Sequence, residues 1–261
     1  MSASTITLDY DGICKQFGSG ETGVLALEDI DLEVGAQEFV SIVGPSGCGK
    51  STLLNITAGL HAPSDGTILF EGQDITELDL TGDIGFVFQS PVLLDWRTVR
   101  KNILLPVEIM EKNGDIDEDL DFYRNRAREL IELVGLDGFG DAYPRELSGG
   151  MQQRVSICQA LIYDPKILLM DEPFGSLDAL TKDKLNFELL DIWRETKKTI
   201  LFVTHDLEEA TFLSDKVVVL SDRPGRIEEV IEIDLERPRT EAVRKSAEYR
   251  ELIDRVHQYF R

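Results

Sequence analysis

The chain has 261 residues, of which 42% are hydrophobic and 29% are charged, a composition typical of a globular protein with a sizeable core. Its 27 Lys and Arg against 49 Asp and Glu give a formal net charge of −22, which disfavours a dedicated nucleic-acid-binding role because phosphate backbones would be repelled. No apolar run approaches the ~20 residues of a transmembrane helix. Segment 1–12 has neither the basic nor the apolar stretch of a secretory signal, and the 3 scattered cysteines are typical of a reducing cytoplasm.

The predicted elements begin with two strands, in which apolar side chains alternate at Ile6, Leu8 and Tyr10 and again at Ile30, Leu32 and Val34. An apolar strand at 38–44 then enters a glycine-rich turn, and a helix follows that closes near Gly59. Helical periodicity dominates between about 90 and 150, where one apolar stripe is formed by Ala127, Leu130, Ile131 and Val134. The rest predicts alternating strands and helices, ending in a strand with Ile231, Ile233 and Leu235 on one face.

Strands that alternate with helices predict an α/β fold with a mainly parallel sheet and helices on both faces. We interpret 1–261 as a single domain, whose core is formed by 1–89, including the antiparallel strands, and 155–235. Segment 90–154 is predicted to be an inserted α-helical subdomain, and 236–261 a charged helical tail.

A phosphate-binding loop is predicted at 44–52, where GPSGCGKST matches the pattern G-x-x-x-x-G-K-[ST] between a strand and a helix. Its glycines let backbone N–H groups approach phosphate oxygens, and the helix adds its positive N-terminal end. Lys50 is expected to reach the β- and γ-phosphates, and the Ser51 hydroxyl to ligate Mg²⁺. The predicted nucleotide-binding residues of this loop are Gly44, Pro45, Ser46, Gly47, Cys48, Gly49, Lys50, Ser51 and Thr52.

The segment ILLMDEP at 167–173 is an apolar strand that ends in two carboxylates. Asp171, at the strand end, is predicted to hold Mg²⁺ directly or through water. Glu172 is predicted to polarise the water that attacks the γ-phosphate. Next to a phosphate loop these roles are favoured over an ordinary exposed turn.

A second glycine-containing helix start occurs in LSGGMQQR at 147–154. Two adjacent glycines there are explained if backbone N–H groups approach an anion, with the Ser148 hydroxyl as a further donor. The N-K-x-D motif of small GTPases is absent from the sequence. Together, these motifs resemble those of the ATP-binding-cassette (ABC) ATPases, over almost the whole chain from Ile6 to Leu235.

The resemblance implies a P-loop NTPase (RecA-like) fold and the cofactors ATP and Mg²⁺. It implies that Phe17 stacks on adenine, that Gln89 senses Mg²⁺ and the attacking water, and that His205 contacts the γ-phosphate. The loop that joins two cassettes corresponds to Ser176, Leu177 and Asp178. The signature segment, which binds the ATP of a partner subunit, corresponds to Leu147, Ser148, Gly149, Gly150, Met151 and Gln152. Two cassettes, identical or equivalent, are then expected to pack head to tail with ATP between them.

The stretch QSPVLLDWRTVRKNILLPVE after Gln89 resembles bacterial importers of the nitrate, sulfonate and taurine type. This implies membrane permease partners, indirectly a solute-binding protein, and a place at the cytoplasmic face of the membrane. Val92, Leu93, Leu94 and Trp96 either line the groove for a permease helix or pack in the helical core. The alternatives are an exporter or lipoprotein-release ATPase and a soluble ABC ATPase acting on nucleic acid, which the charge opposes. A nucleotide-binding module without turnover is disfavoured because Glu172 and His205 are present.

Overall fold

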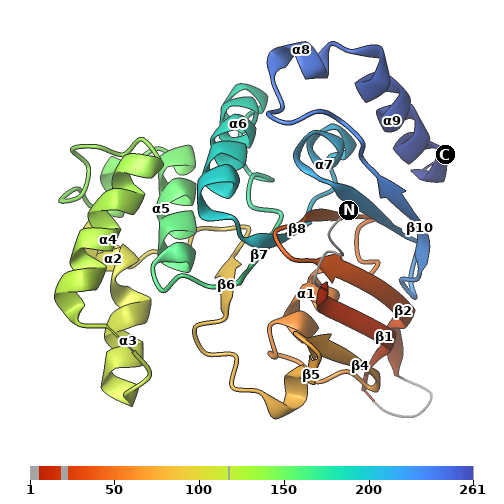
Figure 1. Ribbon diagram of the computed structural model, residues 1–261, viewed down its shortest axis with the longest axis horizontal. Helices are drawn as coiled ribbons and strands as arrows, with labels where there is room; N and C mark the ends of the chain where they lie inside the picture. The colour runs from red at the N-terminus through yellow and green to blue at the C-terminus, as the bar shows by residue number, and fades with distance from the viewer. Residues whose placement is uncertain (1–5, 19–22, 117, 261) are drawn as a thin grey trace. The chain divides into compact units, whose positions relative to one another are not determined.

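The computed structural model describes residues 6–18, 23–116 and 118–260. The first five residues of segment 1–12, which lacks the features of a secretory signal, lie outside the described residues. The chain divides into two compact units (Figure 1), which are taken separately below. The first unit contains Met1–Leu80, Leu169–Glu172 and Lys197–Arg261, and the second contains Thr81–Leu168 and Pro173–Thr196.

An antiparallel sheet forms the N-terminal part of the first unit, with the strand order β2-β1-β4-β5. The predicted alternation is confirmed where side chains are described, because Leu8 and Tyr10 on β1 are buried and so are Leu32 and Val34 on β2. These side chains cover the core face of the sheet. The strands are β1 (Ile6–Phe17), β2 (Val24–Gly35), β4 (Asp65–Phe70) and β5 (Gln73–Asp74).

A second, mainly parallel sheet follows the order β10-β9-β3-β8-β7 in this unit. β3 is parallel to both β8 and β9, and its five residues are all buried, as expected of a central strand covered on both faces. The loops that follow β3, β7, β8 and β9 therefore lie at the carboxyl edge of one sheet. The strands are β3 (Phe39–Val43), β7 (Ile167–Asp171, of which the last three residues belong to this unit), β8 (Thr199–Val203), β9 (Lys216–Leu220) and β10 (Ile227–Glu232).

The last strand is shorter than its apolar alternation suggests. β10 is antiparallel to β9, and its final residue, Glu232, pairs with Lys216, the first residue of β9. The strand ends before Ile233 and Leu235, although Ile233 is still buried and its amide donates to the carbonyl oxygen of Asp215, the residue before β9. The Leu235 amide instead bonds to the Ile233 carbonyl oxygen.

The helices of the first unit include a tail that packs on the sheet. α7 contacts β3 and β9 and packs against α9, whereas α1 contacts β2 and β8. Val256 of α9 joins a buried cluster with Ala210 of α7 and Val217 and Val219 of β9. The tail is therefore part of the core of this unit. The helices are α1 (Lys50–Thr57), α7 (Leu207–Leu213), α8 (Glu241–Arg244) and α9 (Ala247–His257), with 3-10 turns η2 (Ile75–Glu77) and η4 (Gln258–Phe260).

A buried arginine joins the start of the tail to α7. Arg239, which is 5% exposed, donates to the carbonyl oxygens of Thr211, Phe212 and Ser214, at 2.9–3.2 Å. Burial lowers the pKa of Arg239 to about 10. These bonds satisfy carbonyl groups that the C-terminal end of a helix leaves free.

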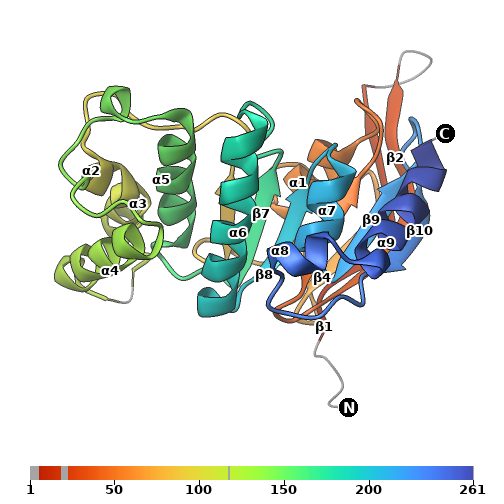
Figure 2. The same ribbon diagram turned by 90° about the horizontal axis from the view of Figure 1, so that it is seen from above.

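The second unit is a helical bundle that includes α2, α3, α4 and α5 (Figure 2), with one strand, β6, beside the start of β7. The predicted stripe Ala127, Leu130, Ile131 and Val134 is buried and defines the inner face of α4. The unit is broader than the segment 90–154, because β6 and α6 belong to it. Its elements are β6 (Ile84–Val87), α2 (Val99–Ile103), α3 (Leu105–Asn113), α4 (Leu120–Leu133), η3 (Pro144–Glu146), α5 (Gly149–Leu161) and α6 (Ala179–Thr196).

The architecture has the predicted α/β class, with a mainly parallel sheet, an antiparallel sheet formed by N-terminal strands and a helical region inserted in the chain. In the parts of the chain that the structure describes, no helix combines the length and the apolarity required to span a bilayer.

Candidate functional site

The predicted phosphate loop connects the buried strand β3 to helix α1 in the first unit. Gly49, immediately before α1, has φ of 113°, and an added Cβ would lie 2.6 Å from Leu27 Cδ2 and 2.8 Å from the Ala26 carbonyl oxygen. Only glycine fits this conformation and this close approach. The loop is therefore held tightly against β2 just where the helix begins.

Lys50 is buried although it carries a charge, with only 6% of its surface exposed. Its Nζ donates to the carbonyl oxygens of Gly44 and Pro45, at 2.7 and 2.8 Å, so the ammonium group lies inside the curve of the loop. An ammonium group enclosed by backbone in this way is placed to meet phosphate oxygens that enter the loop.

Cys48 lies in the same loop and fills space. Its side chain is buried, and an added Cβ at Gly44 would lie 2.8 Å from its Sγ. Burial raises the pKa of the Cys48 thiol, against the opposing charge of Lys50. The thiolate is thus disfavoured, in agreement with a packing role.

The predicted metal ligands Ser51 and Asp171 meet at the carboxyl edge of the sheet. Ser51 Oγ donates to Asp171 Oδ1 at 2.9 Å. Neighbouring ligands of an octahedral Mg²⁺ ion, each about 2.1 Å from the metal, are about 3 Å apart, so this pair of hard oxygen atoms fits the ion. Burial and, to a smaller degree, the Glu172 carboxylate raise the pKa of Asp171, while the Ser51 hydrogen bond and the Lys50 charge oppose that rise. A cation at this position would stabilise the ionised carboxylate.

Glu172 and His205 form a carboxylate–imidazole pair next to that metal position. Glu172 Oε2 and His205 Nδ1 are 3.0 Å apart. The Glu172 amide bonds to the Val203 carbonyl oxygen, which ties the residue to the end of β8. Glu172 also has a φ of 44°, in the left-handed region that non-glycine residues rarely adopt. Backbone strain of this kind is common at functional sites.

Phe17, the predicted adenine platform, ends β1 with 40% of its surface exposed. Lys15 Nζ lies 5.1 Å from the centre of its ring, and the His61 ring meets it edge-on at 5.7 Å. Sequence reasoning gave His61 no role. No motif marks His61, and only the fold brings it to Phe17.

The signature segment lies in the second unit at the start of α5. Ser148 is the N-cap of this helix, and its Oγ accepts a hydrogen bond from the Met151 amide at 3.3 Å. Gly149 is exposed, whereas Leu147 and Gly150 are buried. Gln152 Nε2 donates to the Pro144 carbonyl oxygen at 2.9 Å and fixes the preceding turn. The helix start therefore presents backbone N–H groups near an exposed glycine.

The predicted dimer loop lies against this helix start. An added Cβ on Gly149 would lie 3.2 Å from Leu177 Cδ2. Ser176 and Asp178 are exposed, and Asp178 accepts hydrogen bonds from the Thr181 amide and hydroxyl. The fold thus brings together Gly149 and Leu177, which are 28 positions apart in the sequence.

Gln89 also belongs to the second unit, two residues beyond the end of β6, and is exposed. The residue before Gln89, Phe88, is held by the side chain of Gln153 on α5, which donates to the Phe88 carbonyl oxygen at 3.3 Å. This contact anchors the backbone that precedes Gln89.

The predicted apolar stretch after Gln89 divides into two kinds of residue. Trp96 and Val92 are 75% and 60% exposed, whereas Leu93 and Leu94 are half-buried. The segment is fixed by the fully buried Asn102 of α2, whose side chain accepts from the Leu94 amide and donates to the Leu94, Arg97 and Thr98 carbonyl oxygens. Packing of Trp96 in the helical core is therefore excluded. The residue stands on a rigid loop with its indole outside.

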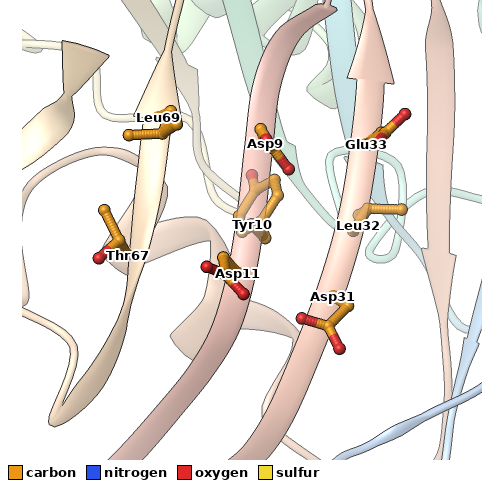
Figure 3. Close-up of a pocket in the computed structure, with 8 residues that line it drawn as sticks. All are labelled: Asp9, Tyr10, Asp11, Asp31, Leu32, Glu33, Thr67 and Leu69. Carbon is orange, nitrogen blue, oxygen red and sulfur yellow. The ribbon is translucent and has the colours of Figure 1, made fainter. Parts of the chain in front are cut away.

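A hollow on the antiparallel sheet is a poor nucleotide site (Figure 3). Its lining, from β1, β2 and β4, includes Asp9, Asp11, Asp31 and Glu33. Four carboxylates would repel a phosphate chain. The groups that suit phosphate are instead gathered at the carboxyl edge of the parallel sheet, around Lys50.

Comparison with known proteins agrees with this geometry. Residues 27–175 match the family model described as ABC transporter. The chain is 48% identical over 250 residues to an uncharacterized ABC transporter ATP-binding protein of Methanocaldococcus jannaschii, a match that covers 95% of this chain and 90% of that protein. It is 42% identical over 255 residues to an aliphatic sulfonates import ATP-binding protein of Bacillus cereus, covering 98% and 96%.

A similar solved structure is the dimeric post-hydrolysis state of an ATP-binding cassette bound to ADP and Pi. It has a TM-score of 0.74 and 33% sequence identity, and the likeness covers 88% of this chain and all of that one. The sequence, the fold and the arrangement around Lys50 lead to one conclusion: the chain belongs to the ABC transporter family, as an ATP-binding and ATP-hydrolysing cassette.

Proposed function

We propose that this cassette drives the import of a small anion or organic solute, such as nitrate, a sulfonate or taurine, across the cytoplasmic membrane. The observation that carries the catalytic part is the meeting of three groups at one sheet edge: buried Lys50, the Ser51–Asp171 pair and the Glu172–His205 pair. The sulfonate-import relative, 42% identical over nearly the full chain, supports the solute class.

The loop 44–52 would bind the phosphates of ATP through its backbone N–H groups and Lys50. Ser51 and Asp171 would hold Mg²⁺, which supplies neutralising charge to the phosphate oxygens when bound. For Gln89, which belongs to the other unit, a role as a further ligand is carried over from the family resemblance alone. Phe17 would stack on the adenine, with its exposed ring as the platform.

Glu172 would accept the proton of the attacking water, because an ionised carboxylate at this position can act as a general base. His205 would hold that carboxylate in position through the 3.0 Å contact and turn its other ring nitrogen toward the γ-phosphate. Gln89 would help to orient the water. Hydrolysis would then depend on Glu172, whereas ATP binding would depend on Lys50.

A second cassette is the proposed partner, identical or equivalent to this one. The segment Leu147–Gln152 offers backbone donors and the Ser148 hydroxyl but has no lysine of its own, so it would complete the ATP site of the other subunit. The loop Ser176–Asp178, which lies beside it, would pass between the two subunits. Each ATP would be enclosed in a head-to-tail dimer.

Membrane permease subunits are the second proposed partner, and a solute-binding protein would act with them. Exposed Trp96 and Val92, on a loop fixed by Asn102, offer the apolar surface that a permease helix would cover. The cassette would thus lie at the cytoplasmic face of the membrane, attached through the permease rather than inserted itself.

The experiment that tests import is performed in the source organism. The chromosomal copy is changed to Glu172→Gln, and uptake of labelled taurine, an alkanesulfonate and nitrate is measured. We expect uptake of one of them to fall to background, while Glu251→Gln, an exposed carboxylate on α9, leaves uptake unchanged. Unchanged uptake of all three solutes, with loss of export of another compound, would favour the exporter alternative instead.

A test of docking uses Trp96→Glu in the same strain. The isolated variant is expected to keep its melting temperature and basal ATPase activity, because the residue is 75% exposed. Co-purification with the permease is expected to be lost. A Trp96→Glu cassette that still co-purifies and transports would contradict the proposed docking surface.

A further inference from the structure

The turn between β9 and β10, residues 221–226, lies directly on the phosphate loop. Arg223 Nε and Nη2 both donate to the Gly47 carbonyl oxygen, at 3.0 and 2.9 Å. Gly225 approaches so closely that an added Cβ would lie 2.2 Å from the Cys48 carbonyl oxygen. Two successive carbonyl groups of the phosphate loop are thus contacted by one turn that is about 175 residues away in the sequence.

The turn itself is fixed on its other side. The Gly225 amide donates to the Ala26 carbonyl oxygen at 2.9 Å, and the Glu28 amide donates to the Gly225 carbonyl oxygen at 3.0 Å. Arg226 forms an ion pair with Glu28 at 2.7 Å. Within the turn, the Ser221 hydroxyl bonds to Pro224 and to the Arg226 amide. The turn is therefore a rigid support, anchored to β2, from which Arg223 reaches the phosphate loop.

The bond to Gly47 determines how the next peptide group is oriented. In a trans peptide, C=O and N–H point in opposite directions, so holding the Gly47 carbonyl toward Arg223 turns the Cys48 N–H the other way. There the Cys48 N–H meets the Pro45 carbonyl oxygen at 3.3 Å, one of the two carbonyls that Lys50 Nζ also contacts. Both donors therefore point to the same interior of the loop.

Arg223 is suited to this task because it is not engaged elsewhere. Across residues 6–18, 23–116 and 118–260, its guanidinium has no carboxylate partner, whereas Arg226 of the same turn is paired with Glu28. Gly47 has a positive φ of 78° and no side chain, so its peptide has little local restraint. A two-donor guanidinium is an effective way to fix such a carbonyl.

We propose that Arg223 is a positioning residue of the phosphate site: it fixes the Gly47–Cys48 peptide so that the Cys48 N–H faces the phosphates of the bound nucleotide. This inference rests on the proposed role of loop 44–52. The ligand concerned is the polyphosphate end, whether it belongs to ATP or to an inorganic polyphosphate. Adenine recognition, by contrast, does not involve Arg223.

The test measures binding by calorimetry of Mg-ATP and Mg-tripolyphosphate to the whole purified chain, and kcat and KM for ATP. Arg223→Gln is expected to raise the Kd of both ligands about tenfold, because one charge-assisted contact is worth roughly that factor, while kcat at saturating ATP stays within about twofold. The control, Arg250→Gln, removes the same charge from an exposed position on α9 and should leave both Kd values unchanged.

Two further measurements separate positioning from other effects. The ratio of the Arg223→Gln to wild-type Kd should persist in 0.5 M KCl, whereas an effect of charge alone would be screened. The melting temperature without nucleotide should stay close to that of the wild type, since the side chain is exposed. A ratio that collapses toward one in high salt, or a kcat that falls together with the melting temperature, would overturn the proposal.

Lys50→Ala shows which assignment fails if the result is negative. If Lys50→Ala binds tripolyphosphate as well as the wild type, the phosphate site itself is misplaced and the proposed function fails with it. If Lys50→Ala loses binding while Arg223→Gln binds normally, the site stands and the positioning role of Arg223 is wrong.

Discussion

Helices α1 and α5 each have a glycine and a serine within two residues of their first residue, but their surroundings differ. At α1, buried Lys50 occupies the loop, Ser51 bonds to Asp171, and Arg223 supports the loop from outside. At α5, Ser148 accepts only from the Met151 amide in the described part of the chain, and Gly149 is exposed. One helix start thus combines a buried cation, an oxygen pair and a supported loop, whereas the other has backbone N–H groups and the Ser148 hydroxyl.

This difference indicates what each helix start can do alone. A helix N-terminus attracts an anion weakly, by about 0.3–1 kcal/mol at an exposed position, which does not hold a nucleotide in water. A buried cation, an oxygen pair suited to Mg²⁺ and a fixed loop are needed as well. We therefore expect α1 to bind ATP in the isolated chain and α5 to act only on ATP that another subunit already holds.

The largest effect, on kcat, is expected from removing the general base, a group that lies beside the α1 site and has no counterpart at α5. Glu172→Gln keeps the shape of the side chain but removes the general base, so kcat should fall by roughly 10²–10⁴-fold while ATP binding persists. Because its ATP is not hydrolysed, the variant should accumulate as a closed dimer, visible by size-exclusion chromatography. Near-wild-type turnover of this variant would show that Glu172 is not the base.

A somewhat smaller effect is expected when the α1 site loses its cation. Lys50→Ala should weaken ATP binding by roughly 10–100-fold, because charge-assisted contacts to phosphate contribute about 1.5–3 kcal/mol. Calorimetry with Mg-ATP measures this, with Lys245→Ala as the control, since that lysine is 75% exposed on the tail. If Lys50→Ala binds ATP as well as Lys245→Ala does, the buried lysine gives α1 no advantage over α5, and the contrast between the two helix starts is wrong.

The smallest effects come from a matched pair of glycine substitutions. Gly49→Ala forces alanine to a φ of 113° against Ala26 and Leu27, and should cost about 1–3 kcal/mol of stability together with ATP affinity. Gly149→Ala meets only the end of the Leu177 side chain at 3.2 Å and gains up to about 1 kcal/mol of helix propensity, so its stability should barely change. Urea unfolding of both variants gives the comparison. Equal losses would mean that the two helix starts are equally constrained.

Local sequence signals predicted the elements around the site well. The strand before Gly44, the helix after it, and the carboxylates at the end of β7 are each marked by a short apolar run or a motif next to one. Parallel strands then bring such ends to one edge, which explains why Ser51 and Asp171 meet although they are 120 positions apart.

Contacts between distant loops could not be predicted in the same way. Nothing in the sequence of the turn 221–226 indicates that Arg223 bonds to Gly47, because that bond depends on β9 lying beside β3. The Arg239 contacts with α7 likewise depend on the path of the tail. Alternation and motifs carry no information about such partners.

The central claim, that α1 and α5 are complementary halves of one ATP site, is tested most directly by mixing two inactive variants. Lys50→Ala removes the α1 half, and Ser148→Arg places bulk at the α5 half while leaving its own phosphate loop intact. Each variant alone should hydrolyse little ATP. When they are mixed in equal amounts, half of the pairs are mixed and each holds one intact site, so up to about a quarter of the wild-type rate should return. No recovery on mixing, or a wild-type rate from Ser148→Arg alone, would contradict the claim.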